Sequence, residues 1–201
     1  STGIQIQQTS LSSGNRSIRI QGLDGRYTQL LKDGFPLYGG FSGGLSIMQI
    51  PPLDLAQFEI IKGSSSTLYG GGAIAGLVNM VSKRPEEDPE LNILLAQTHT
   101  GGGTGNIFYS KRKEKLGFTI YGAANYNSPY NPDEDEFTNI PKTTSFSLNP
   151  KLFYYPKENT TIWLGLNATT DNREGGDINV VKNGTDANHT YFENNTSNRV
   201  S

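Results

Sequence analysis

The chain has 201 residues, 24 of them glycine and none cysteine, with a formal net charge of −2 and a mean hydropathy of −0.50. The lack of cysteine excludes a disulfide scaffold, and the sequence contains no run of the roughly 18–20 apolar residues that a transmembrane helix needs. The near-neutral charge gives no reason to expect nucleic acid or an anionic membrane as partner. With 34% apolar residues and many glycine turns, the composition indicates a mainly β protein.

Both ends of the chain suggest that it is a piece of a longer protein. Ser1 is not followed by a charged segment and an apolar run, so we expect any signal peptide to have been removed or to lie upstream. At the other end, the polar residues 194–201 begin like a strand and stop.

Residues 1–85 predict a small α+β domain. Segments 4–7 and 17–21 alternate apolar and polar residues, as half-buried strands do. Asp33-Gly34 follows an apolar pair and is a strong hairpin signal. The pattern further along predicts short elements, which in chain order are a helical turn at 53–57, a strand at 58–62, a short helix at 64–69 and a strand at 75–83.

The second part of the chain predicts a β-meander. An acidic segment at 86–90 is typical of a linker, and residues 91–201 follow it with a different composition. Candidate strands of about 9 to 12 residues lie at 91–100, 105–113, 117–127, 144–155 and 160–170. Such strands are long for a globular protein, where about 5–6 residues is usual. They suit a tilted strand that crosses a bilayer, which needs roughly 9–11 residues.

Two further features bear on the membrane question. In the third strand, Phe118 and Ile120 fall on one face and Thr119 and Tyr121 on the other. Tight turns at 113–116 and 157–160 alternate with long polar loops at 128–143 and from 171 onward, an alternation that outer-membrane barrels have. A soluble β-sandwich with aromatic residues in its core has the same strand pattern, so the pattern alone leaves both architectures open.

The strongest motif covers residues 53–83, LDLAQFEIIKGSSSTLYGGGAIAGLVNMVSK. It closely resembles the plug of TonB-dependent outer-membrane receptors, where an acidic short helix is followed by E-I-I-K-G, S-x-L-Y-G and A-I-x-G-x-x-N-x-x-x-K. Upstream, residues 18–22 and 31–37 look like the family's I-R-I-x-G and L-x-D-G-x-P-L. The segment is nearer to receptors for iron chelates, haem or cobalamin than to the glycan importers of the family.

The resemblance implies an architecture and a function. Residues 1–85 would be the C-terminal part of an α+β plug, 86–90 a linker, and 91–201 the first antiparallel transmembrane strands of an incomplete barrel of about 22 strands. The whole receptor would sit among the lipids of the bacterial outer membrane. It would bind a scarce nutrient, with a ferric siderophore or other iron chelate as the expected ligand. A TonB-type inner-membrane partner would remodel the plug for import, and we expect its contact box to lie outside this chain. No cofactor and no nucleic acid are implied.

The resemblance also implies a ligand-binding loop. In the family, the loop after L-x-D-G-x-P-L contributes to the ligand floor. Here it holds the candidate residues Tyr38, Gly39, Gly40, Phe41, Ser42, Gly43 and Gly44. Tyr38 and Phe41 would stack on a flat ligand, while the glycines let the backbone approach it closely. The alternative is a flexible linker with Tyr38 packed against the plug.

Arg19 and Glu59 are charges inside otherwise apolar strands, and such groups are rarely buried without partners. We expect ion pairs within the plug or to the barrel wall; the alternative is simple exposure on a polar face.

The remaining signals are weaker. The acidic run 133–136 would suit Ca²⁺ but is more typical of a solvated loop, and His99 and His189 lie too far apart in sequence to predict a metal site. No Ser/His/Asp or paired-carboxylate arrangement has a context that supports catalysis, so we expect no enzyme. Two rival interpretations are a soluble secreted β-sandwich that binds carbohydrate through Trp163 and tyrosines, and a repetitive adhesin. The lack of internal repeats disfavours the adhesin.

Overall fold

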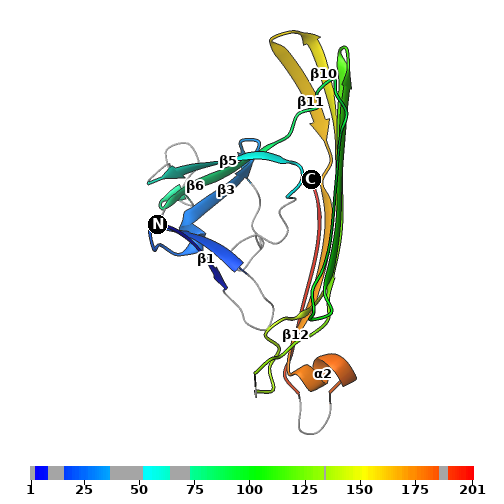
Figure 1. The fold of residues 1–201 in the computed structure, drawn as a ribbon. Helices are drawn as coiled ribbons and strands as arrows, with labels where there is room; N and C mark the ends of the chain where they lie inside the picture. Colours follow the sequence, from blue (N-terminus) through cyan, green and yellow to red (C-terminus); the bar gives the residue numbers. More distant parts are fainter. Residues whose placement is uncertain (1–2, 9–15, 37–51, 64–72, 134, 186–189) are drawn as a thin grey trace. The chain divides into compact units, whose positions relative to one another are not determined.

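The computed structural model in Figure 1 describes residues 3–8, 16–36, 52–63, 73–133, 135–185 and 190–201. These residues form two compact units, one ending at Lys83 and the other spanning Arg84–Ser201. Strands dominate both units. Within the described residues, no helix is both long and apolar enough to span a membrane. The helix expected at 64–69 lies outside the described residues.

The first unit is built on a four-stranded mixed sheet in the order β4-β3-β6-β5. Its strands are β3 (Thr28–Lys32), β4 (Phe35–Pro36), β5 (Leu55–Lys62) and β6 (Gly76–Ser82). Strand β6 runs parallel to β3 and antiparallel to β5. A separate antiparallel pair, β1 (Ile4–Gln8) with β2 (Arg16–Ile20), precedes the 3-10 helix η1 (Gly25–Tyr27). The expected small mixed sheet is confirmed.

Local sequence explains the hairpin between β3 and β4 but not the start of β5. Asp33 and Gly34 have positive φ angles of 53° and 84°, the combination that a type I′ turn requires. The helical turn expected at 53–57 is wrong, because β5 already begins at Leu55, opposite Ser82 of β6. Pairing with β6 satisfies the backbone groups of this segment and overrides a weak helical preference.

The core of the first unit centres on β6. This strand lies between β3 and β5, and Leu77, Val78 and Met80 are each at most 3% exposed. Successive side chains of a strand point to opposite faces, so β6 is buried on both sides. On one of these faces Val78 clusters with Ile20 and Ala75.

The second unit is one antiparallel sheet in the order β13-β12-β10-β9-β8-β7, with β11 also paired to β10 (Figure 1). Its strands are β7 (Glu90–Gln97), β8 (Gly103–Lys113), β9 (Leu116–Asn127), β10 (Lys142–Lys157), β11 (Thr160–Gly165), β12 (Ala168–Gly176) and β13 (Phe192–Val200). The helix α2 (Ile178–Asn183) lies between β12 and β13 in the chain. The expected tight turns after β8 and β10 are confirmed.

Two expectations for the second unit are wrong. The single strand expected at 160–170 is two strands, because β11 pairs with residues 151–157 of β10 and β12 pairs with residues 142–148. The loop expected from 171 onward instead continues β12 to Gly176 and leads through α2 to β13. These strands are rich in Thr, Asn and charged residues, so they lack the apolar alternation that reveals a strand in sequence.

The two faces of this sheet are reversed with respect to a soluble protein. On β9 the apolar side chains are exposed, with Leu116 at 65% and Phe118 and Ile120 at 39% each. The intervening Thr119 and Tyr121 are only 4% and 2% exposed. The expected separation of the faces is confirmed, and it is the apolar face that is uncovered.

We predict that Gly76→Ala destabilises the first unit by about 3 kcal/mol, because an added Cβ combines backbone strain with overpacking. Gly76 has φ +143°, and a Cβ there would lie 2.3 Å from the carbonyl oxygen of Ile61. The measurement is the hydrogen-exchange protection of the β6 amides in the complete protein.

Gly22→Ala is the matched control, since Gly22 has φ +79° but no atom within 4 Å of an added Cβ. It should cost only about 1 kcal/mol. Equal losses in the two variants would contradict the clash at Gly76.

Candidate functional site

The candidate ligand loop, Tyr38 to Gly44, lies outside the described residues, so its role stays a prediction. The structure does describe the two stems of that segment. The incoming stem is the β3–β4 hairpin, which ends at Pro36, and the outgoing stem contains Asp54 and leads into β5. How these stems are joined determines how firmly the loop is mounted.

A buried ion pair joins the two stems. Lys32 Nζ lies 2.8 Å from Asp54 Oδ2, and the two side chains are only 15% and 6% exposed. The N–H of Lys83 also donates to the carbonyl oxygen of Asp54, at 2.7 Å. The outgoing stem is therefore held to β3 by a side chain and to the end of β6 by its backbone.

The hairpin turn is fixed to β6 by hydrogen bonds from Ser82. The Asp33 carboxylate accepts from the Ser82 N–H at 2.7 Å and from its hydroxyl at 2.8 Å. The Asp33 N–H donates to the carbonyl oxygen of Met80 at 2.9 Å. A carboxylate that accepts two such bonds holds the turn in one position.

A second set of hydrogen bonds links the hairpin turn to Glu59 on β5. Asn79 Oδ1 accepts from the N–H of Gly34 at 3.0 Å, and its Nδ2 donates to Glu59 Oε2 at 2.8 Å. Gln57 Nε2 donates to the other Glu59 oxygen at 2.9 Å. Glu59 is thus linked to the turn through the side-chain amide of Asn79.

Arg19 lies elsewhere in the first unit. Its Nη2 is 3.9 Å from Asp24 Oδ2, a loose and partly exposed pairing, and its Nε is buried without a hydrogen-bond partner. Asp24 also caps η1 by accepting from the N–H of Arg26. The structure does not bring Arg19 and Glu59 together, and a functional ion-pair role for either stays a prediction.

The sequence did not single out Lys32, Asp54, Asn79 or Ser82. The Lys-Asp-Gly run at a predicted turn was the one available signal, since charges beside a hairpin often fix it to a neighbour. The partners come from positions 22 and 49 residues away in the chain, which only the sheet topology brings together.

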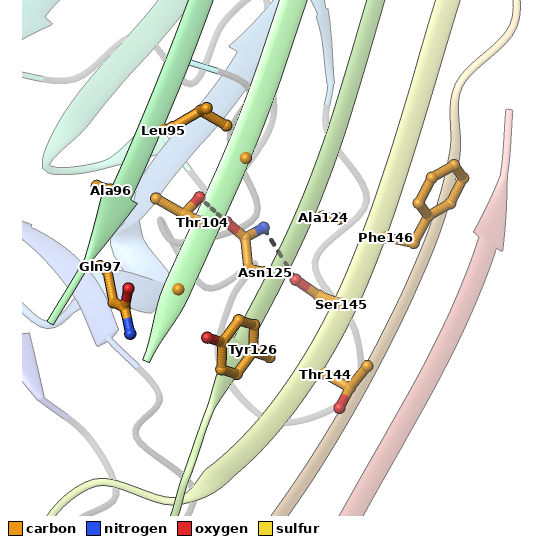
Figure 2. Close-up of a pocket in the computed structure, with 12 residues that line it drawn as sticks. Leu95, Ala96, Gln97, Thr104, Ala124, Asn125, Tyr126, Thr144, Ser145 and Phe146 are labelled. Atoms are coloured by element: carbon orange, nitrogen blue, oxygen red, sulfur yellow. Dashed lines mark hydrogen bonds between the residues drawn. The ribbon is translucent and has the colours of Figure 1, made fainter. Parts of the chain in front are cut away.

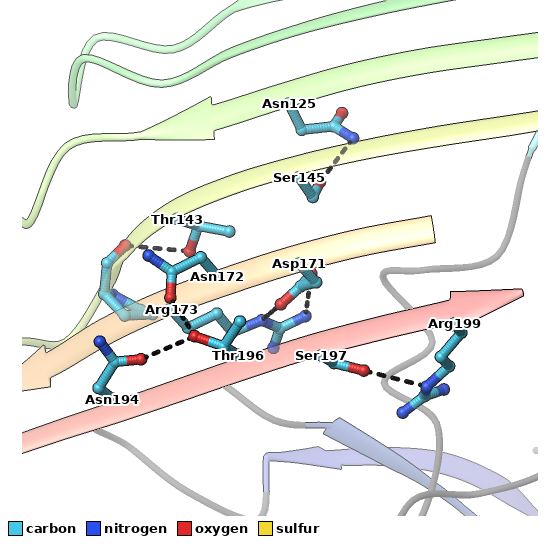
Figure 3. A network of polar contacts seen from close by, with 11 residues as sticks. Asn125, Thr143, Ser145, Asp171, Asn172, Arg173, Asn194, Thr196, Ser197 and Arg199 are labelled. Carbon is cyan, nitrogen blue, oxygen red and sulfur yellow. Dashed lines mark hydrogen bonds and ion pairs between the residues drawn. The ribbon is translucent and has the colours of Figure 1, made fainter. Parts of the chain in front are cut away.

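In the second unit, the covered face carries a polar network. Tyr121 Oη donates to Asn106 Oδ1 at 2.7 Å, and Asn106 Nδ2 donates to Thr104 Oγ1 at 3.1 Å. Further along this face, Arg173 Nε lies 2.8 Å from Asp171 Oδ1, with both side chains at most 6% exposed (Figure 3). Buried polar groups that are fully paired stiffen the sheet that holds them.

The opposite, apolar face of this sheet holds a shallow hollow of about 700 Å³ (Figure 2). It forms because Gly105 and Ala124, which lie between Leu95 and Phe146 across the strands, have little or no side chain. Strand pairing places these residues on the same face as the exposed Phe118 and Ile120. We therefore do not assign this hollow to the nutrient ligand.

Among the described residues, no three His, Cys, Asp or Glu side chains gather as a metal site would require. In the acidic loop, Asp133 Oδ2 accepts from Asn139 Nδ2, and Asp135 Oδ1 accepts from the N–H of Phe137. His99 packs edge-to-face on Tyr130, with ring centroids 6.2 Å apart.

Comparison with known proteins identifies the domain type of the first unit. Residues 1–77 match the family model described as the TonB-dependent Receptor Plug Domain. The first part of this chain is a TonB-dependent receptor plug domain. The resemblance seen in the sequence is thereby confirmed.

The relatives extend the similarity beyond the plug domain. A ferrioxamine receptor of Yersinia enterocolitica is 29% identical over 151 residues, which are 74% of this chain and 19% of that protein. The siderophore receptor PirA of Acinetobacter baumannii superposes with a TM-score of 0.64 at 20% identity, covering 86% of this chain and 28% of that one. The copper transporter OprC superposes with a TM-score of 0.68 at 19% identity, covering 88% and 27%. The chain thus spans about a fifth of the length of this ferrioxamine receptor.

We predict that Asp54→Ala loosens the stems of the plug-domain loop, at a cost of about 3 kcal/mol, because it leaves the Lys32 ammonium buried without its partner. Protection of the β3 and β6 amides against hydrogen exchange, measured in the complete protein, reports this cost.

The double variant Lys32→Met/Asp54→Leu removes both charges and should recover most of the loss, since an apolar pair replaces a desolvated ion pair. A single-variant cost below about 1 kcal/mol, the usual value of an exposed pair, would show that the bridge is unimportant.

Proposed function

We propose that this chain is part of an outer-membrane receptor that binds a ferric chelate at the cell surface and imports it when a TonB-type partner remodels the plug. The observation that carries the proposal is the plug-domain match at residues 1–77. The following sheet, with its uncovered apolar face, supports it. Because the chain spans only part of its relatives, the proposal concerns the whole receptor.

The exposed apolar face supports a place in the bilayer. Leu95, Leu152 and Leu164 are 80%, 64% and 75% exposed on the sheet of the second unit. In water, each such side chain would forgo roughly 1.5–3 kcal/mol of burial. Lipid acyl chains would cover this face, and the hydrogen bonds between paired strands would satisfy their backbone groups within the membrane.

The soluble carbohydrate-binding β-sandwich is not favoured. A sandwich would pack a second sheet on the apolar face, whereas the exposed side chains here extend over β7, β9, β10 and β11. Trp163, the aromatic residue proposed for sugar stacking, lies with its ring centroid 5.5 Å from Lys151 Nζ. This cation–π contact uses one face of the ring.

The relatives favour an iron chelate as the ligand, but they do not identify which chelate. The relative matched over 151 residues is a ferrioxamine receptor, and the structural neighbours include the siderophore receptor PirA of Acinetobacter baumannii and the ferric yersiniabactin uptake receptor FyuA of Yersinia pestis. The copper transporter OprC has a comparable fold, so the fold alone does not select the metal. We therefore propose a ferric chelate on the strength of the sequence match.

Within the plug domain, we propose that Tyr38 and Phe41 contact the chelate and that the glycines between and after them let the backbone reach it. The stems described above support this role. An ion pair, a carboxylate with two donors and a bridging asparagine hold both ends of the loop on one sheet. Stems held in this way need not be ordered when the ligand binds, which favours affinity.

The test is titration of the complete receptor with a ferric hydroxamate chelate, ferrioxamine. Tyr38→Ala and Phe41→Ala should each weaken binding about tenfold, the loss of roughly 1.4 kcal/mol expected for an aromatic contact.

Phe35→Ala is the matched control, because Phe35 is a 66% exposed aromatic residue on β4, close in sequence to the loop. Its affinity should equal that of the parent. If both loop variants bind as the parent does, the loop is not part of the site; if the parent binds neither ferrioxamine nor any other ferric chelate, the proposed function fails.

A further inference from the structure

The chain enters the second unit through residues 84–89, and part of this segment is held against the sheet. The second unit begins at Arg84, so the segment belongs to it by its contacts. Pro85 is buried, whereas Arg84, Glu86 and residues 87–89 are exposed. The connection between the two units is therefore docked at one residue and solvated around it.

Pro85 occupies a notch that one glycine leaves in the sheet. Arg112, Gly117 and Phe153 pair directly with one another across β8, β9 and β10. Directly paired residues of antiparallel strands point to the same side, so Gly117 leaves a gap between two large side chains. A Cβ on Gly117 would lie 2.6 Å from Pro85 Cγ, which shows that the proline ring fills this gap. We name Arg112, Gly117 and Phe153 the linker notch.

The residues that border the notch are held by their own neighbours. The Arg112 N–H donates to the carbonyl oxygen of Glu86 at 2.7 Å, which fixes the residue after the proline. The Arg112 guanidinium lies 4.0 Å from the centroid of the Tyr155 ring, and its Nε donates to the carbonyl oxygen of Glu114 at 2.9 Å. Phe153 stacks on the same tyrosine, with ring planes 9° apart. The notch is therefore a built site on the sheet.

Strand register shows that the chain has slack beyond the notch. Glu90 pairs with Ser110, so an uninterrupted β7 would place Asp88 opposite Arg112. The structure instead binds Glu86 there, two positions earlier in the chain. The extra residues loop out between this bond and the start of β7. Tension that arrives along the chain from the first unit therefore loads Glu86 before it loads the first pair of β7.

We propose that the linker notch is a fixed tether for the plug domain, so that residues up to Lys83 rearrange during import while Pro85 and Glu86 stay docked. This inference rests on the proposed function, because it needs a partner that remodels the plug. The tether passes the load to β8 and β9, which lie inside the sheet. It spares β7, whose pairs with β8 would otherwise separate one at a time.

Hydrogen exchange in urea, measured on the complete receptor in detergent, tests whether the linker stays docked when the plug domain opens. We expect the Arg112 amide, whose acceptor is Glu86, to remain protected at urea concentrations that release the β6 amides. Loss of protection at Arg112 together with the β6 amides overturns the proposal, because the linker would then move with the plug domain.

The variant Gly117→Ala fills the notch. Gly117 is not among the glycines with positive φ, so an added Cβ acts through its clash with Pro85 and not through backbone strain. We expect the Arg112 amide to exchange about tenfold faster, as overpacking of a docked contact implies. The double variant Pro85→Ala/Gly117→Ala removes the proline Cγ from the clash and should recover part of the protection.

Gly122→Ala is the matched control on the same strand. Gly122 lies on the apolar face, where an added Cβ would reach only ordinary contact, 3.4 Å from Ile107 Cγ2. Exchange at Arg112 should equal that of the parent. Equal exchange at Arg112 in Gly117→Ala and Gly122→Ala would overturn the proposal, because it would show that Pro85 does not depend on the notch.

A disulfide between positions 85 and 117 tests the tether during import. Pro85 Cβ lies 3.3 Å from the Cβ that a side chain at 117 would have, close to the roughly 3.5–4.5 Å usual between disulfide Cβ atoms. We expect cells with oxidised Pro85→Cys/Gly117→Cys receptor to import ferrioxamine as fast as cells with the reduced form. Import that stops on oxidation and returns on reduction overturns the proposal, and so does failure of the two cysteines to cross-link.

The exchange measurements need neither chelate nor partner, so they separate this inference from the proposed function. If the parent imports no ferric chelate while Arg112 stays protected, the docked linker stands and the iron-receptor assignment fails. Import of ferrioxamine by a receptor whose Arg112 amide is released together with the β6 amides would do the reverse.

Discussion

Side-chain alternation along the long antiparallel strands is the constraint on which the second unit depends. Every second residue of β9 belongs to an uncovered apolar face, and the residues between belong to a covered polar one. A shift of the register by one residue would exchange the two faces. The paired network of Tyr121, Asn106 and Thr104 favours the observed register, since its bonds form only when these side chains share a face. The same alternation, continued into β12 and β13, sets where the apolar surface ends.

The plug domain meets a different requirement, because it has a small core and must present a loop. Its core centres on one strand, β6, and the loop stems are tied to that strand largely through polar side chains. The Lys32–Asp54 bridge closes the base of the loop at a buried site, where breaking a pair costs more than it would at the surface. The proposed receptor therefore combines a firmly mounted loop with a sheet that needs lipid to cover it.

Local signals in the sequence predicted much of this arrangement, and long-range pairing accounts for the rest. Asp33-Gly34 predicted the hairpin because the φ angles of a type I′ turn suit these residue types. The extent of β12 and β13 was not predicted, although residues 194–201 looked like the beginning of a strand, because these strands are stabilised by pairing with β10 and with each other and not by apolar periodicity. The strand expected at 160–170 is interrupted at 166–167 because its two parts, β11 and β12, pair with different segments of β10. Within the site, Lys32 and Asp54 are 22 residues apart, so only the fold could pair them.

The central claim is that the apolar face of the second unit lies against lipid, and single spin labels along residues 116–126 test it directly. These 201 residues contain no cysteine, so a cysteine introduced among them is the only one in this part of the protein. In the complete protein in bilayers, the account predicts a period of two: labels at 118 and 120 are accessible to oxygen dissolved in the lipid, and labels at 119 and 121 are shielded from it. Uniform accessibility, or high accessibility to a water-soluble relaxation agent at 118 and 120, would contradict the account.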